Sequence, residues 1–107
     1  MLMLYSTWPN SESALACGRA LIEGRLAGCA SVLPGVTSVY RWEGAVQTEG
    51  EAVLLVKTSA AQAAQARDLI LARHPYDLPC LIALPVEAAA SHGAYLDWVR
   101  AETESGS

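Results

Sequence analysis

The sequence predicts an α+β fold in which helices cover one face of an antiparallel sheet, built around a long hairpin. The first observation is a pair of extended runs between Cys29 and Thr58, joined near Glu43-Gly44. Their β-branched, aromatic and aliphatic side chains fit a pleated surface, and glycine permits the positive φ of a tight turn. The second observation is that shorter apolar runs alternate with helical segments on both sides of the hairpin. Strands commonly span only ~5–6 residues, so we expect the outer hairpin to pack against another copy of the chain.

The N-terminal part predicts a strand followed by a helix. Residues 2–7 form a short apolar run that ends at Pro9, because proline has no N–H to give to a ladder. Asn10 is the expected N-cap of a helix from about Ser11 to Ala27, and Gly28 is its expected C-terminal stop. Apolar residues recur there at a spacing near 3.6 and predict a buried face. That face comprises Ala14, Leu15, Gly18, Leu21, Ile22 and Leu26.

The hairpin is interrupted at Pro34-Gly35, a pair that cannot continue a regular ladder. A kink or bulge there should redirect the outer arm. After the hairpin, Thr58 or Ser59 is the expected cap of a second helix through the alanine-rich segment 60–71. Arg73 and His74 fall in its last turn, before Pro75 ends it.

The C-terminal part predicts one more strand and one more helix. Residues 81–84 form a short apolar run between two prolines and read as a buried strand, and residues 95–99 predict a short amphipathic helix. The order βαββαβ followed by a C-terminal helix is the split βαβ, ferredoxin-like arrangement. Residues 1–107 are expected to form a single domain.

Composition excludes several classes of partner. The chain has a net charge of −4, and its seven Lys and Arg residues are dispersed, which argues against nucleic acid. It has no run of about eighteen apolar residues, so we expect no membrane span, and the first residues show no signal peptide. Three cysteines without a CxxC pair predict a reduced, cytoplasmic protein. A hydrophobic content of 52% without a membrane segment indicates an oligomer.

Three residues could hold a soft metal ion. Thiolates and imidazole suit Cu(I) or Zn(II), and the set Cys29, His74 and Cys80 offers both. Each also has a structural interpretation, since a lone Cys is usually a small buried hydrophobe and a His at a helix end can satisfy the last carbonyls. No phosphate loop or other catalytic motif is present, so we expect no enzyme.

A second set of residues could line a ligand cleft or an interface. Tyr40, Trp42 and Tyr76 are aromatic residues of a kind enriched where two protein surfaces meet. Lys57 ends an apolar strand, either as a surface cation or as a buried one aimed at a carboxylate. Glu43 of the same or a neighbouring chain is the expected carboxylate, because an unpaired buried ammonium is costly.

The segments LAGCASVLPGVTSVYRWEGAVQ, VLLVKT, HPYDLP, LIALPV and YLDW resemble the CutA divalent-cation tolerance proteins over nearly the whole chain. The resemblance implies a homotrimer assembled through the hairpin, similar in architecture to PII-type signalling proteins, and binding of copper or other divalent metal ions. No cofactor is expected to be required for folding. The family's recurrent residues fall on Cys29, Tyr40, Trp42, Glu43, Gly44, Lys57, Thr58, His74, Pro75, Tyr76, Pro79 and Trp98.

The sequence departs from the family pattern at two positions. Cys80 stands where the family usually has Glu, which removes an acidic partner for Lys57 or a hard metal ligand. Ser6 stands where some members carry Cys. Two other functions stay open: a PII-like sensor or scaffold with a small ligand in inter-subunit clefts, and an enzyme of acylphosphatase type. The latter has little support, because the first strand-to-helix turn lacks the Arg of a phosphate-cradling loop.

Overall fold

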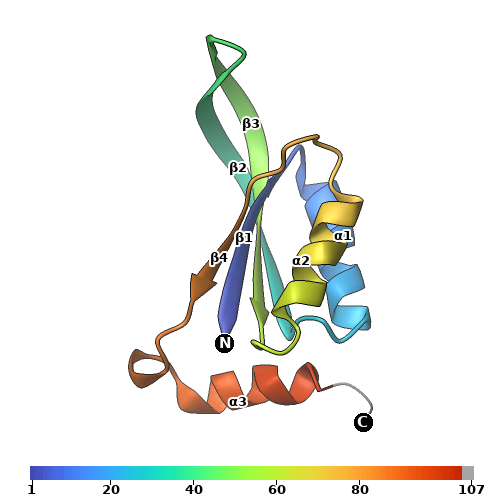
Figure 1. Ribbon diagram of the computed structural model, residues 1–107, viewed down its shortest axis with the longest axis vertical. Helices are drawn as coiled ribbons and strands as arrows, with labels where there is room; N and C mark the ends of the chain where they lie inside the picture. The colour runs from blue at the N-terminus through green and yellow to red at the C-terminus, as the bar shows by residue number, and fades with distance from the viewer. Residues whose placement is uncertain (105–107) are drawn as a thin grey trace.

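The computed structural model describes residues 1–104, which form one four-stranded antiparallel sheet with helices (Figure 1). The elements are β1 (Leu2–Trp8), α1 (Ser11–Glu23), β2 (Cys29–Trp42), β3 (Ala45–Thr58), α2 (Ala63–Arg73), β4 (Leu81–Pro85), the 3-10 helix η1 (Ala88–Ala90) and α3 (Gly93–Glu102). The strand order is β2-β3-β1-β4, and α1 and α2 lie on one side of the sheet. This arrangement confirms the predicted ferredoxin-like α+β fold. No helix within the described range is long and apolar enough to cross a membrane.

The predicted hairpin is confirmed, with 14 residues in each arm. Its turn has φ 50° at Glu43 and 81° at Gly44, and two consecutive positive values define the turn type that suits the twist of a hairpin. The predicted bulge is also present, because the register shifts between Leu33 and Val36 and Gly35 has φ 72°. Figure 1 shows the outer half of the hairpin extending beyond the helices and the other strands.

The core lies between the sheet and the two helices. Leu4 and Trp8 of β1 and Leu54 of β3 are at most 3% exposed, and they pack with Leu21 of α1 and Ile70 of α2. Asn10 caps α1 as predicted, accepting a 2.8 Å hydrogen bond from the Ser13 amide. Side chains at even positions of β1 and β3 therefore fill the core.

The opposite side of the sheet, called here the open face, keeps large apolar side chains in contact with solvent. Leu33, Ile82 and Leu84 are 43%, 53% and 42% exposed. Tyr5 and Leu55, which pair directly in the ladder, lie half-buried at its centre. The prediction that β4 is buried was therefore wrong, because β4 is an edge strand and one of its faces belongs to this open side.

The predicted end of the first helix was wrong. The helix stops at Glu23, and the Arg25 and Leu26 amides bond the Ile22 and Leu21 carbonyls, with Arg25 at φ 57°. This is the usual C-terminal capping pattern of helices, here built on Arg rather than Gly. The predicted buried face was also partly wrong: Leu15 and Ile22 are 53% and 40% exposed, and Cys17 is buried instead.

The start of the second helix differs from the prediction as well. Thr58 is the last residue of β3, and its hydroxyl donates to the Leu26 carbonyl at 2.6 Å instead of capping a helix. The helix begins at Ala63, and Gln62 occupies the cap position without a side-chain bond to the helix. The C-terminal helix, α3, is longer than the predicted 95–99 and lies across the end of the sheet (Figure 1).

Candidate functional site

A cluster of polar side chains, called here the lysine group, lies at one end of the open face. Cys29 and Lys57 are direct partners in the β2–β3 ladder, so their side chains share a face. The Lys57 ammonium donates to the Ser31 hydroxyl at 2.7 Å and lies 3.8 Å from the Cys29 sulfur. Tyr95 of α3 is the fourth member of the group and interacts with Cys29. The pKa of its phenol is raised, first by burial and then by the hydrogen bond with Cys29. The group thus combines an ammonium, two hydroxyls and a thiol.

The lysine group contains no carboxylate. Lys57 takes part in none of the ion pairs formed between residues 1 and 104. Glu43 lies in the hairpin turn, beyond the far end of β3, and about twelve residues of strand put it roughly 40 Å from Lys57. The expectation of a Lys57–Glu43 pair within one chain is therefore wrong, and a pair between chains stays a prediction.

A second cluster, called here the phenol–acid group, lies farther out on the hairpin and comprises Tyr40, Glu49, Glu51 and Tyr76. The Tyr76 hydroxyl donates to Glu51 Oε2 at 3.2 Å. Burial and then the Glu51 charge raise the pKa of Tyr76 to about 12. Desolvation and then the charge of Glu49 raise the pKa of Tyr40. Each phenol therefore stays protonated beside a carboxylate and can donate a hydrogen bond to it.

The predicted cleft residues do not form one cleft within a single chain. Tyr40 and Tyr76 come together with the two glutamates, whereas Lys57 belongs to the lysine group. Trp42, 45% exposed, and Glu43 lie at the outer end of the hairpin. Both groups nevertheless share the open face, because Glu49, Glu51 and Lys57 occupy alternate positions of the same strand.

Sequence reasoning missed Ser31, Tyr95, Glu49 and Glu51 as site residues. The glutamates read as an ordinary solvated strand face, and nothing local marks them otherwise. Ser31 could have been found from the ladder, since it lies two residues from Cys29 on the same face. Tyr95 could not, because its position depends on how α3 docks against the sheet.

His74 holds the loop after α2 against the end of β1. Its Nε2 lies 2.7 Å from the Thr7 carbonyl oxygen, and its Nδ1 accepts a hydrogen bond from the Tyr76 amide at 3.2 Å. A carbonyl can only accept and an amide N–H can only donate, so Nε2 carries the proton. The ring also packs against Trp8, with centroids 4.3 Å apart. Both ring nitrogens are thus already engaged, and neither offers a lone pair to a metal ion.

The single chain does not bring Cys29 together with His74 and Cys80. Cys29 pairs with Lys57 of β3, and Lys57 pairs in turn with Met3 of β1. His74 instead bonds Thr7, and Cys80 comes directly before the β4 residue that pairs with Ser6. Four residues of strand correspond to roughly 13 Å. Among the described residues, no three His, Cys, Asp or Glu side chains are arranged to hold a metal ion. One protomer therefore does not bring the three expected ligands together, and its described residues alone do not fit a metal ion. A site that draws these ligands from different chains stays a prediction.

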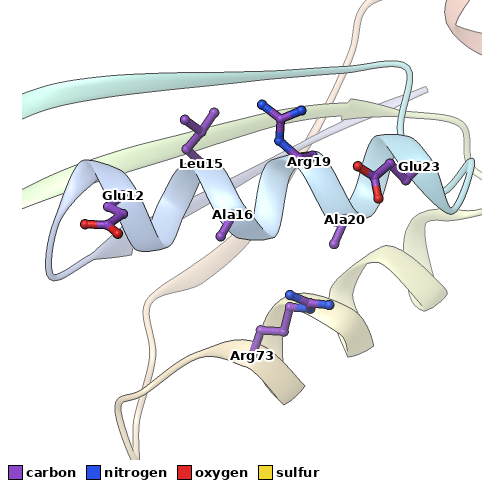
Figure 2. A pocket seen from close by; sticks show the side chains of 7 residues that line it. All are labelled: Glu12, Leu15, Ala16, Arg19, Ala20, Glu23 and Arg73. Carbon is purple, nitrogen blue, oxygen red and sulfur yellow. The ribbon is translucent and has the colours of Figure 1, made fainter.

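An open groove of about 390 Å³ lies between α1 and α2, on the helical side of the molecule. Figure 2 shows Arg73 of α2 pointing across it toward Ala16 and Ala20 of α1, while Arg19 points away from α2. The two cations therefore do not converge on one point. This groove is separate from both polar groups of the open face.

Comparisons with known proteins agree with this fold. The family model described as CutA1 divalent ion tolerance protein matches residues 2–102. The divalent-cation tolerance protein CutA of Thermus thermophilus is 42% identical over 97 residues, which cover 91% of this chain and 92% of that protein. Protein CutA of Homo sapiens is 38% identical over 94% of this chain, and the chain spans 55% of the human protein's length.

A solved structure with the same architecture is the PII-like protein CutA from Nostoc sp. PCC 7120 in apo form. It superimposes with a TM-score of 0.90 at 32% identity, covering 97% of this chain and 98% of that one. The family match spans nearly all described residues, and the fold superimposes on that of this solved CutA protein. The chain belongs to the CutA1 divalent ion tolerance protein family.

Proposed function

We propose that this protein is a cytoplasmic homotrimer that acts in divalent-cation tolerance by binding copper or another divalent metal ion, without catalysis. The observation that carries the proposal is the open face of this chain, which belongs to the family. Within one chain, nothing packs against the apolar side chains of that face or against the outer part of the long hairpin. Burial of apolar surface is the main driving force for association, and homo-oligomer interfaces are the most apolar kind. The free state of all three cysteines supports a reduced compartment.

Metal binding in this proposal needs more than one copy. Within a protomer the predicted ligands are apart and His74 is engaged, so ligands have to come from different chains. Cys29 and Cys80 are both free and half-buried, and a trimer would contain three copies of each. Thiolates favour Cu(I) or Zn(II) over Mg(II), whose octahedral shell needs oxygen ligands.

Equilibrium dialysis with Cu(I), Cu(II) and Zn(II) tests this proposal. Cys29→Ser and Cys80→Ser should each weaken binding of the soft ions, and binding should fall with pH because the ligands must be deprotonated. Cys17→Ser is the matched control, since Cys17 lies on the buried face of α1, 1% exposed, and is not a predicted ligand. A Cys29→Ser/Cys80→Ser double variant that stays trimeric and binds copper as tightly as the parent would disprove it.

The alternative is a PII-like sensor or scaffold that binds a small ligand between subunits. The specific observation in its favour is the lysine group, where an ammonium without a carboxylate and two hydroxyls could bind an oxyanion. A thermal-shift screen of nucleotides and carboxylate metabolites tests it. Stabilisation that Lys57→Met abolishes supports the sensor, whereas metal binding without any such stabilisation favours the first proposal.

A further inference from the structure

The open face has opposite charge at its two ends. Along β3 the outward side chains run from Glu49 and Glu51, through Val53 and Leu55, to Lys57. The acidic end is fixed by the Tyr76 hydroxyl, and the basic end is fixed by the Ser31 hydroxyl. The centre between them is apolar. Such a surface is complementary to a second copy of itself, because the acidic end of one copy can meet the basic end of another.

Lys57 and Glu51 cannot pair within one chain. They are separated by six residues of the same strand, roughly 20 Å. Both side chains are half-buried in one chain, and a partner protein that covers the open face would remove the remaining water from both. A desolvated ammonium or carboxylate without an opposite charge is strongly unfavourable, so any body that covers this face has to supply a partner for each.

Glu51 fits this role better than the other glutamates of the hairpin. Glu43 lies in an exposed turn, and Glu49 is exposed and interacts with Tyr40. Glu51 is half-buried, held by the Tyr76 hydroxyl, and adjoins the apolar centre of the face. A carboxylate held in place loses less conformational entropy when it forms an ion pair.

We propose that in the assembled protein the Glu51 carboxylate of one copy pairs with the Lys57 ammonium of the next, so that each inter-subunit cleft is completed by two chains. One chain supplies the lysine group, and the other supplies Glu51 with Tyr76 and Tyr40. This proposal rests on the proposed homotrimer and names the contact that closes it. Glu51 then takes the role that the sequence assigned to Glu43 of a neighbouring chain.

Charge reversal tests the pair. Lys57→Glu and Glu51→Lys each place like charges together, and each should raise the dissociation constant of the assembly about tenfold or more. The double variant Lys57→Glu/Glu51→Lys restores opposite charges and should recover most of the loss. Glu49→Lys is the matched control, because it changes the same net charge on the same strand, and it should have a clearly smaller effect.

Mixing the two single variants distinguishes a contact between chains from one within a chain. Each single variant carries the complement of the other, so an equimolar mixture should assemble better than either alone, as measured by light scattering across a dilution series. A trimeric wild type whose double variant assembles no better than the worse single variant would overturn the pair while leaving the trimer intact. A monomeric wild type would instead overturn the proposed function itself.

Discussion

At the scale of single residues, His74 is the clearest case of a family residue with a structural role in this chain. Replacing it with Ala leaves the Thr7 carbonyl and the Tyr76 amide without partners and removes a ring packed on Trp8. We expect His74→Ala to lower the free energy of unfolding by about 2–4 kcal/mol in urea titrations at a fixed protein concentration. His92→Ala is the control, because His92 is exposed, and it should change the free energy by less than about 0.5 kcal/mol. A His74→Ala variant as stable as the parent, but unable to bind copper, would establish His74 as a ligand.

Cys17 links stability to alkaline pH. Burial raises the pKa of its thiol to about 11, from an ordinary value of 9.0. The unfolded chain therefore loses this proton before the folded chain does, and the stabilisation present below pH 9 is lost as the pH rises toward 11. The expected loss is on the order of 2 kcal/mol.

Denaturant titrations at pH 8 and pH 10.5 on the parent and on Cys17→Ala isolate this contribution, since other alkaline groups titrate in both proteins. Stability should fall less steeply with pH in the variant. Equal slopes in the two proteins would contradict a buried, protonated thiol at position 17.

The residue-level site was only partly predictable, for a geometric reason. The turn at Glu43-Gly44 and the bulge at Pro34-Gly35 together set the β2–β3 register, so the pairing of Cys29 with Lys57 follows from features visible in the sequence. The hydrogen bond of His74 could not be predicted in this way. It depends on tertiary packing, which decides where the loop after α2 meets the end of β1.

At the scale of elements, strand boundaries were predicted better than helix boundaries. The arms of the hairpin are long and their turn residues are specific, whereas α1 ends on Arg25 in a conformation that Gly usually adopts. Gly28 was predicted to end that helix because glycine commonly does so. In the structure its lack of a side chain instead allows Val99 of α3 to approach closely, a long-range contact that the sequence does not reveal.

We expect Gly28→Ala to loosen α3. A Cβ at this position would lie 3.1 Å from both the Cα and the Cγ1 of Val99, so the helix would have to move. The cost should be about 1–3 kcal/mol of unfolding free energy, together with faster amide exchange in α3 than in β3.

Gly50→Ala serves as the control for this change, because a Cβ there meets nothing within 4 Å and the backbone has no positive φ. It should be neutral or slightly stabilising. If both variants behave alike, the close approach of Gly28 to α3 does not matter for stability.

At the scale of the whole molecule, assembly is the central prediction. Light scattering at low micromolar concentration should report three chains, with more than ~2,000 Å² buried in total. Trp42→Ala removes an indole that is 45% exposed on the projecting hairpin, and it should weaken the trimer and lower its melting temperature. Trp98→Ala removes an equally exposed indole from α3, and light scattering should still report three chains for this variant. A stable monomer at these concentrations would contradict the prediction.

The position of β1 in the sheet also determines the order in which the chain can fold. Leu2 pairs with Thr58 on one side and with Pro85 on the other, and the earliest partner of any β1 residue is Ala52, opposite Trp8. The first strand to leave the ribosome therefore waits more than forty residues for its first partner. The hairpin turns back through only two residues, and such local closure is both faster and less costly in entropy. Nascent β2 and β3 should therefore pair first, and β1 should then add to the exposed edge of β3.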